Sequence, residues 1–96
     1  MKPLTLFQTL KDLRLDLREV LALEIMSEYS EREPTQTLIT ACLKRGVSSQ
    51  ASTHKYIARL KRRRYIEDVP VRGADKRIHY IRITDKGREF LARVSA

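Results

Sequence analysis

The sequence predicts a mainly α-helical domain that carries one small β-hairpin, and two observations support this class. Apolar residues recur three or four positions apart in several segments before residue 64 and again after residue 84, which is the spacing of helices buried on one side. Between these segments, residues 65–83 are rich in β-branched and aromatic residues around a glycine, as in two strands and their turn. With 96 residues, the chain has the length of one compact domain.

Three helices are predicted in the first half of the chain. The first covers residues 4–13, and the second begins after Asp16, a suitable N-cap, and continues to about Tyr29. Thr35 is predicted to cap the third helix, which ends before Gly46, a residue suited to a left-handed helix stop. In the first helix, Leu6, Leu10 and Leu13 recur at helical spacing. The apolar positions expected on the inward faces of the second and third helices are Leu17, Val20, Leu21, Ile25, Leu38, Ile39, Cys42 and Leu43.

The segment "SQASTHKYIARLKRRR" predicts a fourth helix over residues 49–63, with Ser49 or Ser48 as its N-cap. At 100° per residue, a narrow apolar seam forms along one side of this helix. The seam consists of Thr53, Tyr56, Ile57 and Leu60. The opposite side carries Ala51, Lys55, Ala58 and Arg62, flanked by Ser52, His54 and Arg59.

Two strands and a last helix complete the predicted order of elements. The strands cover residues 65–71 and 77–83 and join at Gly73, with Pro70 at an exposed edge or a bulge. Thr84 is predicted to cap the last helix, which turns Phe90, Leu91 and Val94 inward. Four helices, a hairpin and a final helix, with a tight turn before the fourth helix, are the layout of a winged helix-turn-helix.

The charge of the chain is concentrated in its second half. Residues 1–43 hold five Lys/Arg and seven Asp/Glu, a net charge of −2, whereas residues 44–96 hold fifteen and five, a net charge of +10. This asymmetry indicates a polyanionic partner on one side of the molecule, although a basic surface that only aids solubility has the same composition.

The polar side of the fourth helix has the residue types of a major-groove reader. Small residues allow close approach, Ser, Gln and His side chains can reach base edges, and Lys and Arg can reach phosphates or guanine. The predicted contacts from this helix are Ser49, Gln50, Ser52, His54, Lys55, Arg59 and Arg62. The "KRRR" run at residues 61–64 is a solvated helix end, a phosphate contact or a nuclear localisation signal, and we favour the first two together.

The hairpin tip supplies a second candidate contact. Arg72, Lys76 and Arg77 surround it, and an arginine at a narrow tip can enter a minor groove, where the potential is most negative. Asp75 lies two residues before Arg77 and can hold the guanidinium in a fixed orientation. An ordinary solvent-exposed turn with the same charges is the alternative.

The segments "SSQASTHKYIARL" and "DKRIHYIRITDKGREFL" resemble the MarR (multiple-antibiotic-resistance regulator) family of bacterial winged-helix transcription factors. The match is most specific over Asp75–Gly87, where an Asp-x-Arg tip runs into a strand and then a Thr-x-x-Gly helix start, and it extends more loosely over residues 17–94. The resemblance implies that Ser49–Arg63 is the recognition helix, that Arg77 enters the minor groove and that Asp75 orients it. It also implies a dimer on a palindromic site, and for many members a response to small aromatic acids or oxidants.

Three departures from this family matter. Arg64 stands where a glycine is usual, which predicts a tighter turn or a longer helix, and Glu67 and Asp68 place acid in a strand that is often basic. The chain ends at Ala96, before the long C-terminal helices that form the family's dimer and effector pocket, so we expect no effector sensing. A homodimer is expected to use the first helix, with Leu4, Leu6, Phe7 and Leu10 exposed to pair.

Other chemistry finds little support in the sequence. Cys42 is expected to be buried, His79 to lie at the rim of the core, and the single cysteine to indicate a reducing compartment, hence a cytoplasmic protein. The sequence contains no metal-ligand spacing, catalytic triad or glycine-rich phosphate loop, so no metal, cofactor or enzymatic activity is expected.

The sequence as a whole therefore predicts a double-stranded DNA-binding transcriptional regulator. Residues 1–14 form an N-terminal helix and candidate dimerisation surface, and residues 15–96 form the winged helix-turn-helix domain. The alternative is a winged-helix adaptor that binds a protein partner through the N-terminal helix.

Overall fold

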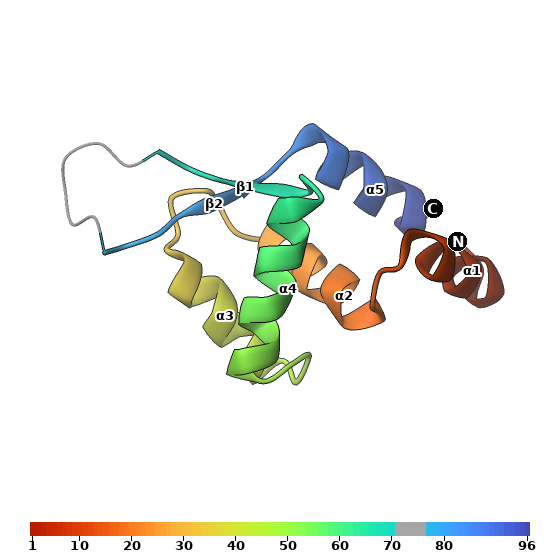
Figure 1. Ribbon diagram of the computed structural model, residues 1–96, viewed down its shortest axis with the longest axis horizontal. Coiled ribbons are helices and arrows are strands. Elements are labelled where there is room, and N and C mark those ends of the chain that lie inside the picture. The colour runs from red at the N-terminus through yellow and green to blue at the C-terminus, as the bar shows by residue number, and fades with distance from the viewer. Residues whose placement is uncertain (71–76) are drawn as a thin grey trace.

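A computed structural model describes residues 1–70 and 77–96 of the chain. In these residues the order of elements is α1 (Pro3–Leu13), α2 (Leu17–Ser27), α3 (Thr35–Lys44), α4 (Gln50–Arg62), β1 (Ile66–Asp68), β2 (Ile81–Ile83) and α5 (Asp85–Ser95). The molecule is elongated, 46 × 26 × 20 Å, with the hairpin at one end of the long axis and α1 at the other (Figure 1). The predicted class, mainly α with a small hairpin, is confirmed.

The helices begin and end largely where the sequence predicts. Asp16 caps α2 in a capping box: its carboxylate accepts the N–H of Arg18 at 2.8 Å, and the Glu19 carboxylate accepts the N–H of Asp16 at 3.2 Å. Gly46 follows α3 with a φ of +72°, the left-handed stop that was expected. Thr84 caps α5, because its hydroxyl accepts the N–H of Gly87 at 3.2 Å.

The prediction for the start of α3 is wrong. Pro34 is the N-cap residue, and Thr35 is already the first residue of the helix. The backbone explains this difference, because the N–H of Thr35 donates to the carbonyl of His79 at 2.9 Å and an isolated bridge pairs Pro34 with Tyr80. The approach to α3 is therefore fixed by the chain that leads into β2, and not by a side-chain cap.

The hairpin is shorter than predicted. Its strands pair antiparallel with Ile66 opposite Ile83, Glu67 opposite Arg82 and Asp68 opposite Ile81. A further hydrogen bond, from the N–H of Val69 to the carbonyl of Tyr80 at 2.9 Å, extends the pairing by one step, and Pro70 lies beyond the strand. Because Val69 occupies a hydrogen-bonded position of the ladder, an N–H at residue 70 would point away from β2, so Pro70 removes no donor from the hairpin.

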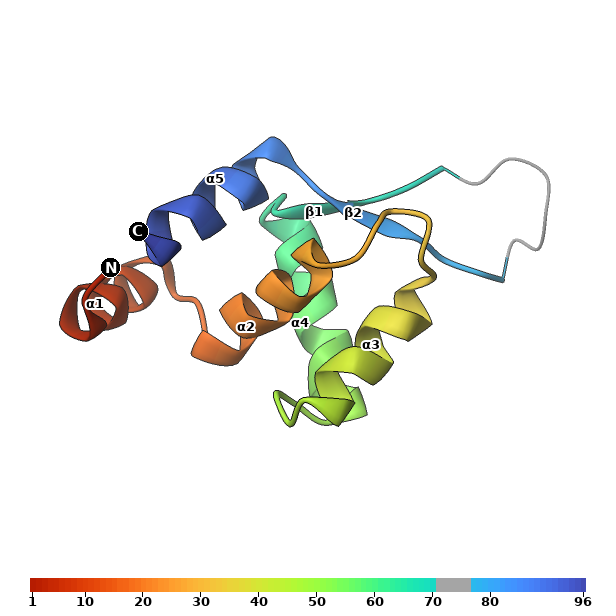
Figure 2. The same cartoon turned by 180° about the vertical axis from the view of Figure 1, so that it is seen from behind.

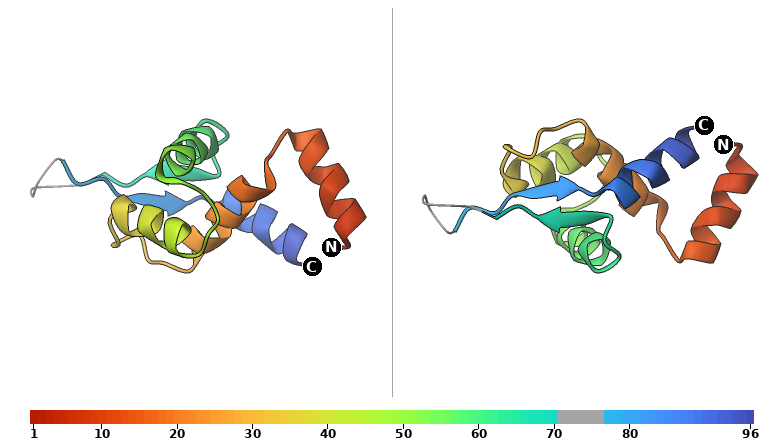
Figure 3. Two further views of the ribbon diagram at one scale, coloured as in Figure 1. Left: turned by 90° about the horizontal axis from the view of Figure 1, so that it is seen from below. Right: turned by 90° about the horizontal axis from the view of Figure 1, so that it is seen from above.

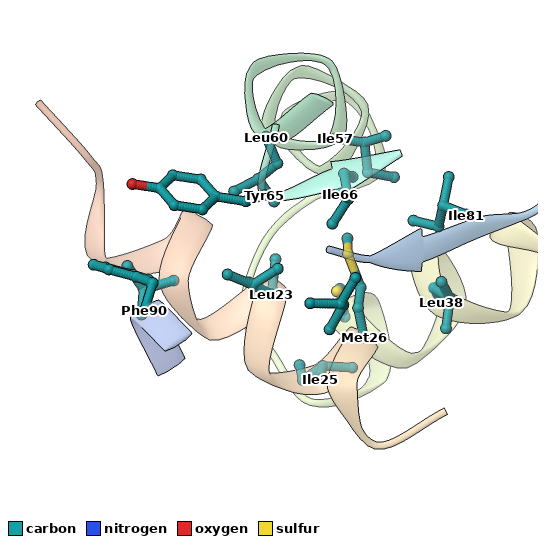
Figure 4. Close-up of a cluster of buried hydrophobic side chains, with 14 of the residues drawn as sticks. Leu23, Ile25, Met26, Leu38, Ile57, Leu60, Tyr65, Ile66, Ile81 and Phe90 are labelled. Carbon is teal, nitrogen blue, oxygen red and sulfur yellow. The ribbon is translucent and has the colours of Figure 1, made fainter. Parts of the chain in front are cut away.

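One hydrophobic core joins all elements of the winged helix (Figure 4). α2 crosses α4, with α4 in front in Figure 1 and α2 in front in Figure 2; α2 also lies against α5 and β2, and α4 against β1. Buried side chains that carry this core include Leu23, Met26, Leu38, Ile57, Leu60, Ile66, Ile81 and Phe90. At roughly 1.5–3 kcal/mol for each fully buried large apolar side chain, this core supplies the main force that holds α4 in place.

Four expected positions differ from the structure. Leu17 and Leu43, predicted to face inward, are exposed, because α2 and α3 bury narrower faces than their apolar patterns indicate. Leu10, predicted to be exposed for pairing, is buried where the end of α1 meets the core. His79, predicted at the rim of the core, is exposed, because β2 begins only at Ile81 and the strand face does not extend back to it.

Arg64 has a φ of +63° in the turn between α4 and β1. α4 ends at Arg62, within one residue of its predicted end, and Arg64 lies in the turn that follows. A side chain with a Cβ costs about 1 kcal/mol in this left-handed conformation, which glycine adopts without penalty.

We therefore expect Arg64→Gly to raise the free energy of unfolding by about 1 kcal/mol, because it relieves the strain of the left-handed residue. Urea denaturation followed by circular dichroism measures this change. Glu24→Gly, inside α2 at an exposed position, is the control and should destabilise the protein by a similar amount. A destabilised Arg64→Gly protein would show that the arginine side chain is needed at this turn.

Candidate nucleic-acid interface

The start of α4 is fixed by three hydroxyl groups. The Ser49 hydroxyl caps the helix by accepting the N–H of Ser52 at 3.2 Å, as the sequence predicts. The Thr53 hydroxyl, fully buried, bonds the carbonyl of Ser49 at 2.7 Å and the hydroxyl of the buried Ser48 at 2.5 Å. These bonds satisfy polar groups that would be costly to bury unpaired, and they fix where the helix begins.

α4 contacts the rest of the protein through one narrow seam. Thr53, Ile57 and Leu60 are buried, one helical turn apart, and Tyr56 beside them is half-buried. In both views of Figure 3, α4 (green) lies at one edge of the molecule, next to the strands. The predicted seam is therefore present.

The opposite face of α4 is open to solvent along its whole length. Gln50, Ala51, His54, Lys55, Ala58 and Arg62 are all exposed, and Ser49 and Ser52 border them, with Ser52 half-buried. Their spacing of three or four residues places them on one stripe. The two alanines leave a low surface between the longer polar and basic side chains.

Arg59 has a different environment from its neighbours on α4. Its guanidinium forms an ion pair with the carboxylate of Glu19 on α2, with Nη1 and Oε1 3.0 Å apart. Glu19 is fully buried, and Arg59 is 41% exposed. The sequence predicted a DNA contact for Arg59, but the structure gives it a partner inside the protein, because the helix wheel could not account for a buried carboxylate on another helix.

The "KRRR" run is also divided between two roles. Lys61 pairs with Asp68 of β1 at 2.8 Å, and the Arg63 guanidinium donates to the carbonyls of Leu13 and Arg14. Arg62 and Arg64 are exposed. None of the three sequence-based interpretations of this run includes the contact of Arg63 with the end of α1.

The acidic residues of β1 are neutralised by basic neighbours. Arg82, opposite Glu67 in the register, pairs with it at 2.7 Å and lies 3.8 Å from Glu31 in the loop before α3. The hydrogen bond and charge of Glu67 raise the pKa of Arg82. Because Glu67 and Asp68 each have a cationic partner, they present less negative charge to a polyanion than the sequence indicates.

Of the predicted hairpin-tip contacts, Arg72, Asp75 and Lys76 lie outside the described residues. Arg77 is described and is exposed. It lines a groove of about 410 Å³ together with Pro34, Ile57 and Lys61, and His54 of α4 borders the same groove. The part of the hairpin before β2 (residues 77–79) and the outer face of α4 therefore adjoin one surface depression.

Cys42 is fully buried in α3, as the sequence predicts. Burial raises the pKa of its thiol, an effect that the charge of Arg45 only partly offsets. In the part of the chain that the structure describes, no three His, Cys, Asp or Glu side chains gather as metal ligands. None of the helices in these residues is both long and apolar enough to cross a membrane.

Comparison with known proteins supports the fold. No protein-family model and no curated protein matches the sequence. Among solved structures, the chain is similar to a mutant of MepR from S. aureus bound to an oligodeoxyribonucleotide, with a TM-score of 0.72 and 16% sequence identity. The match covers 92% of this chain and 61% of that chain, so the protein spans about three fifths of the length of MepR in that structure. The fold is a MarR-like winged helix.

The burial of Cys42 predicts low reactivity of its thiol in the folded protein. We expect a disulfide reagent at pH 8 to label Cys42 at least tenfold more slowly in native buffer than in 6 M urea, because reaction requires an exposed thiolate. Absorbance of the released thiol measures both rates. Similar rates in the two conditions would contradict the buried position.

Proposed function

We propose that the protein is a sequence-specific double-stranded DNA-binding transcriptional regulator whose helix α4 enters the major groove. The observation that carries this proposal is the open stripe on α4, where Gln50, His54, Lys55 and Arg62 flank two alanines. Side chains of these types discriminate base edges and neutralise phosphates, while alanine permits close approach.

The distribution of paired and unpaired cations supports the same proposal. Arg45, Lys61 and Arg82 each have a carboxylate partner within 4.0 Å, on Glu28, Asp68 and Glu67. Among the described residues, Lys55 and Arg62 on the open stripe form no such pair. A cation without a protein carboxylate is available to a phosphate, and it releases counterions on binding.

The hairpin is proposed to extend the contact into the adjacent minor groove. Arg77 would enter that groove, Asp75 would orient its guanidinium, and Arg72 and Lys76 would approach the backbone. The position of Arg77 on the groove that His54 borders favours one continuous surface. The similar MepR structure is a complex with an oligodeoxyribonucleotide, which also favours DNA as the ligand. We assign no enzymatic role, and a cytoplasmic location fits this function.

DNA titrations at several salt concentrations test the proposal. Affinity should fall with a log–log slope of about −5, if roughly six phosphates are contacted per protomer. Lys55→Ala should reduce the size of this slope by about one, and Gln50→Ala or His54→Ala should alter sequence preference more than affinity. Arg88→Ala, at an exposed position on α5, is the matched control and should leave affinity and slope unchanged. Salt-insensitive or absent binding to duplex DNA would refute DNA binding and favour an adaptor.

We also propose that two copies associate through α1. Leu4 and Phe7 on this helix are 67% and 63% exposed, which leaves an apolar face without a partner in the single chain. A second copy is the occupant we propose, because one recognition helix contacts a single half-site and a two-fold dimer contacts two.

Light scattering after size exclusion tests this association. Phe7→Glu should convert a dimer to a monomer, because it places a charge in the apolar contact. Thr5→Glu, which adds the same charge at an exposed position on the same helix, is the control for charge alone. A wild-type protein that stays monomeric at 100 μM, with and without duplex DNA, would overturn the dimer.

A further inference from the structure

Two arginines of α4 reach the carboxyl end of α1. Arg63 donates from Nη2 to the carbonyl of Arg14 at 2.8 Å and from Nη1 to the carbonyl of Leu13. Arg59, one helical turn earlier, lies with its Nη2 3.5 Å from the same Arg14 carbonyl. The last carbonyls of a helix have no donor within the helix and carry the negative end of its dipole, so they attract cations.

The same Arg59 holds the buried charge of α2. Its Nη1 lies 3.0 Å from Oε1 of Glu19, the oxygen that also accepts the N–H of Asp16. Oε2 of Glu19 is buried and has no hydrogen-bond partner in the described residues. Arg59 is therefore the cation that compensates a carboxylate with no access to water, and such a pair is costly to break from one side.

These contacts join α1, α2 and α4 at a point where apolar packing is sparse. α1 lies at the end of the long axis, and most of its length stands apart from the other helices (Figures 1 and 3). Of its side chains only Leu10 is buried, and Leu6 and Leu13 pack partly on the core. The polar contacts of Arg59 and Arg63 therefore contribute a large share of what fixes α1 relative to α4.

We propose that Glu19, Arg59 and Arg63 form an arginine clamp that positions α4 for DNA and couples α1 to DNA affinity. This inference rests on the proposed DNA-binding function. The three residues are positioning residues: they act through α4 and do not touch DNA. Because coupling is reciprocal, a partner that shifts α1 changes DNA affinity, and DNA changes the stability of the end of α1.

Charge-conserving variants separate positioning from direct contact. Arg63→Lys keeps the positive charge but cannot donate two fixed hydrogen bonds to neighbouring carbonyls. We expect it to weaken binding roughly five- to fiftyfold, with the salt slope unchanged. The probe is a duplex that the wild-type protein selects from a random library. Arg88→Lys, the same change at an exposed site on α5, should bind as wild type.

Glu19→Gln distinguishes the clamp from long-range electrostatics, because the two predict opposite changes in DNA affinity. It removes a negative charge, so long-range electrostatics alone would strengthen binding to DNA. The clamp predicts weaker binding, because Arg59 loses the carboxylate that holds it. Circular dichroism tests whether each variant is folded.

Amide hydrogen exchange provides a further test on the wild-type protein, without any substitution. The clamp predicts that DNA slows the exchange of the backbone amides at residues 10–13.

The outcomes distinguish the two proposals. A wild-type protein that binds no duplex refutes DNA binding, and the clamp with it. If the wild type binds but Arg63→Lys and Glu19→Gln bind at least as tightly, the clamp alone is refuted. It is also refuted if Arg63→Ala reduces the size of the salt slope by about one, because the arginine then contacts a phosphate. If neither variant folds, unchanged exchange at residues 10–13 on DNA binding overturns it.

Discussion

The attachment of α4 through a single narrow seam is the constraint on which the rest of the structure depends. Thr53, Ile57 and Leu60 bury one stripe of the helix, and everything else on it is left to solvent or to polar neighbours. A wider apolar face would bury His54 or Lys55, and a narrower one would leave the helix unattached. The seam therefore sets both the stability of the helix and the width of the surface that it presents.

The lysines and arginines in the second half of the chain carry the same charge, but they do not have the same role. Lys61 and Arg82 neutralise the acids of β1, and Arg59 compensates the buried Glu19. Lys55 and Arg62 point from the open side of α4. The net charge of +10 over residues 44–96 thus overstates what is available to a ligand, because part of it serves the protein's own carboxylates and helix ends.

The sequence predicted the features that depend on local patterns. Capping by Asp16, Ser49 and Thr84 and the stop at Gly46 involve neighbours within a few residues, so spacing and residue type were sufficient. The open and buried sides of α4 followed in the same way from helical periodicity. In contrast, the partners of Arg59 and Arg63 lie some 40 to 50 residues earlier in the chain, and no local pattern encodes them.

The start of α3 was missed for the same reason. The carbonyl of His79 accepts the N–H of Thr35, on a segment more than 40 residues away. That hydrogen bond takes the place of a side-chain cap. The tip contacts of Arg72, Asp75 and Lys76 remain predictions from the sequence, since those residues lie outside the described part of the chain.

The turn that follows α4 is where the two proposed DNA-reading elements meet, and its surroundings give the Thr-x-x-Gly sequence a structural role. The Thr84 hydroxyl donates to the carbonyl of Arg64 at 2.6 Å, and its N–H donates to the carbonyl of Tyr65 at 3.0 Å. Gly87 approaches so closely that a Cβ would collide with the carbonyl oxygen of Tyr65 and lie 2.8 Å from Cγ2 of Ile83. Glycine is therefore required here by space.

This turn is consequently held from two sides. The start of α5 binds its carbonyls through Thr84, and Lys86 adds a hydrogen bond to the carbonyl of Arg63 at 2.8 Å. On the other side, the Arg63 side chain binds the end of α1. Because β1 begins directly after the turn, a displacement of α1 or α5 acts on the end of α4 and on the base of the hairpin together. The angle between helix and hairpin, which a duplex would sense, therefore depends on residues that lie away from the proposed DNA surface.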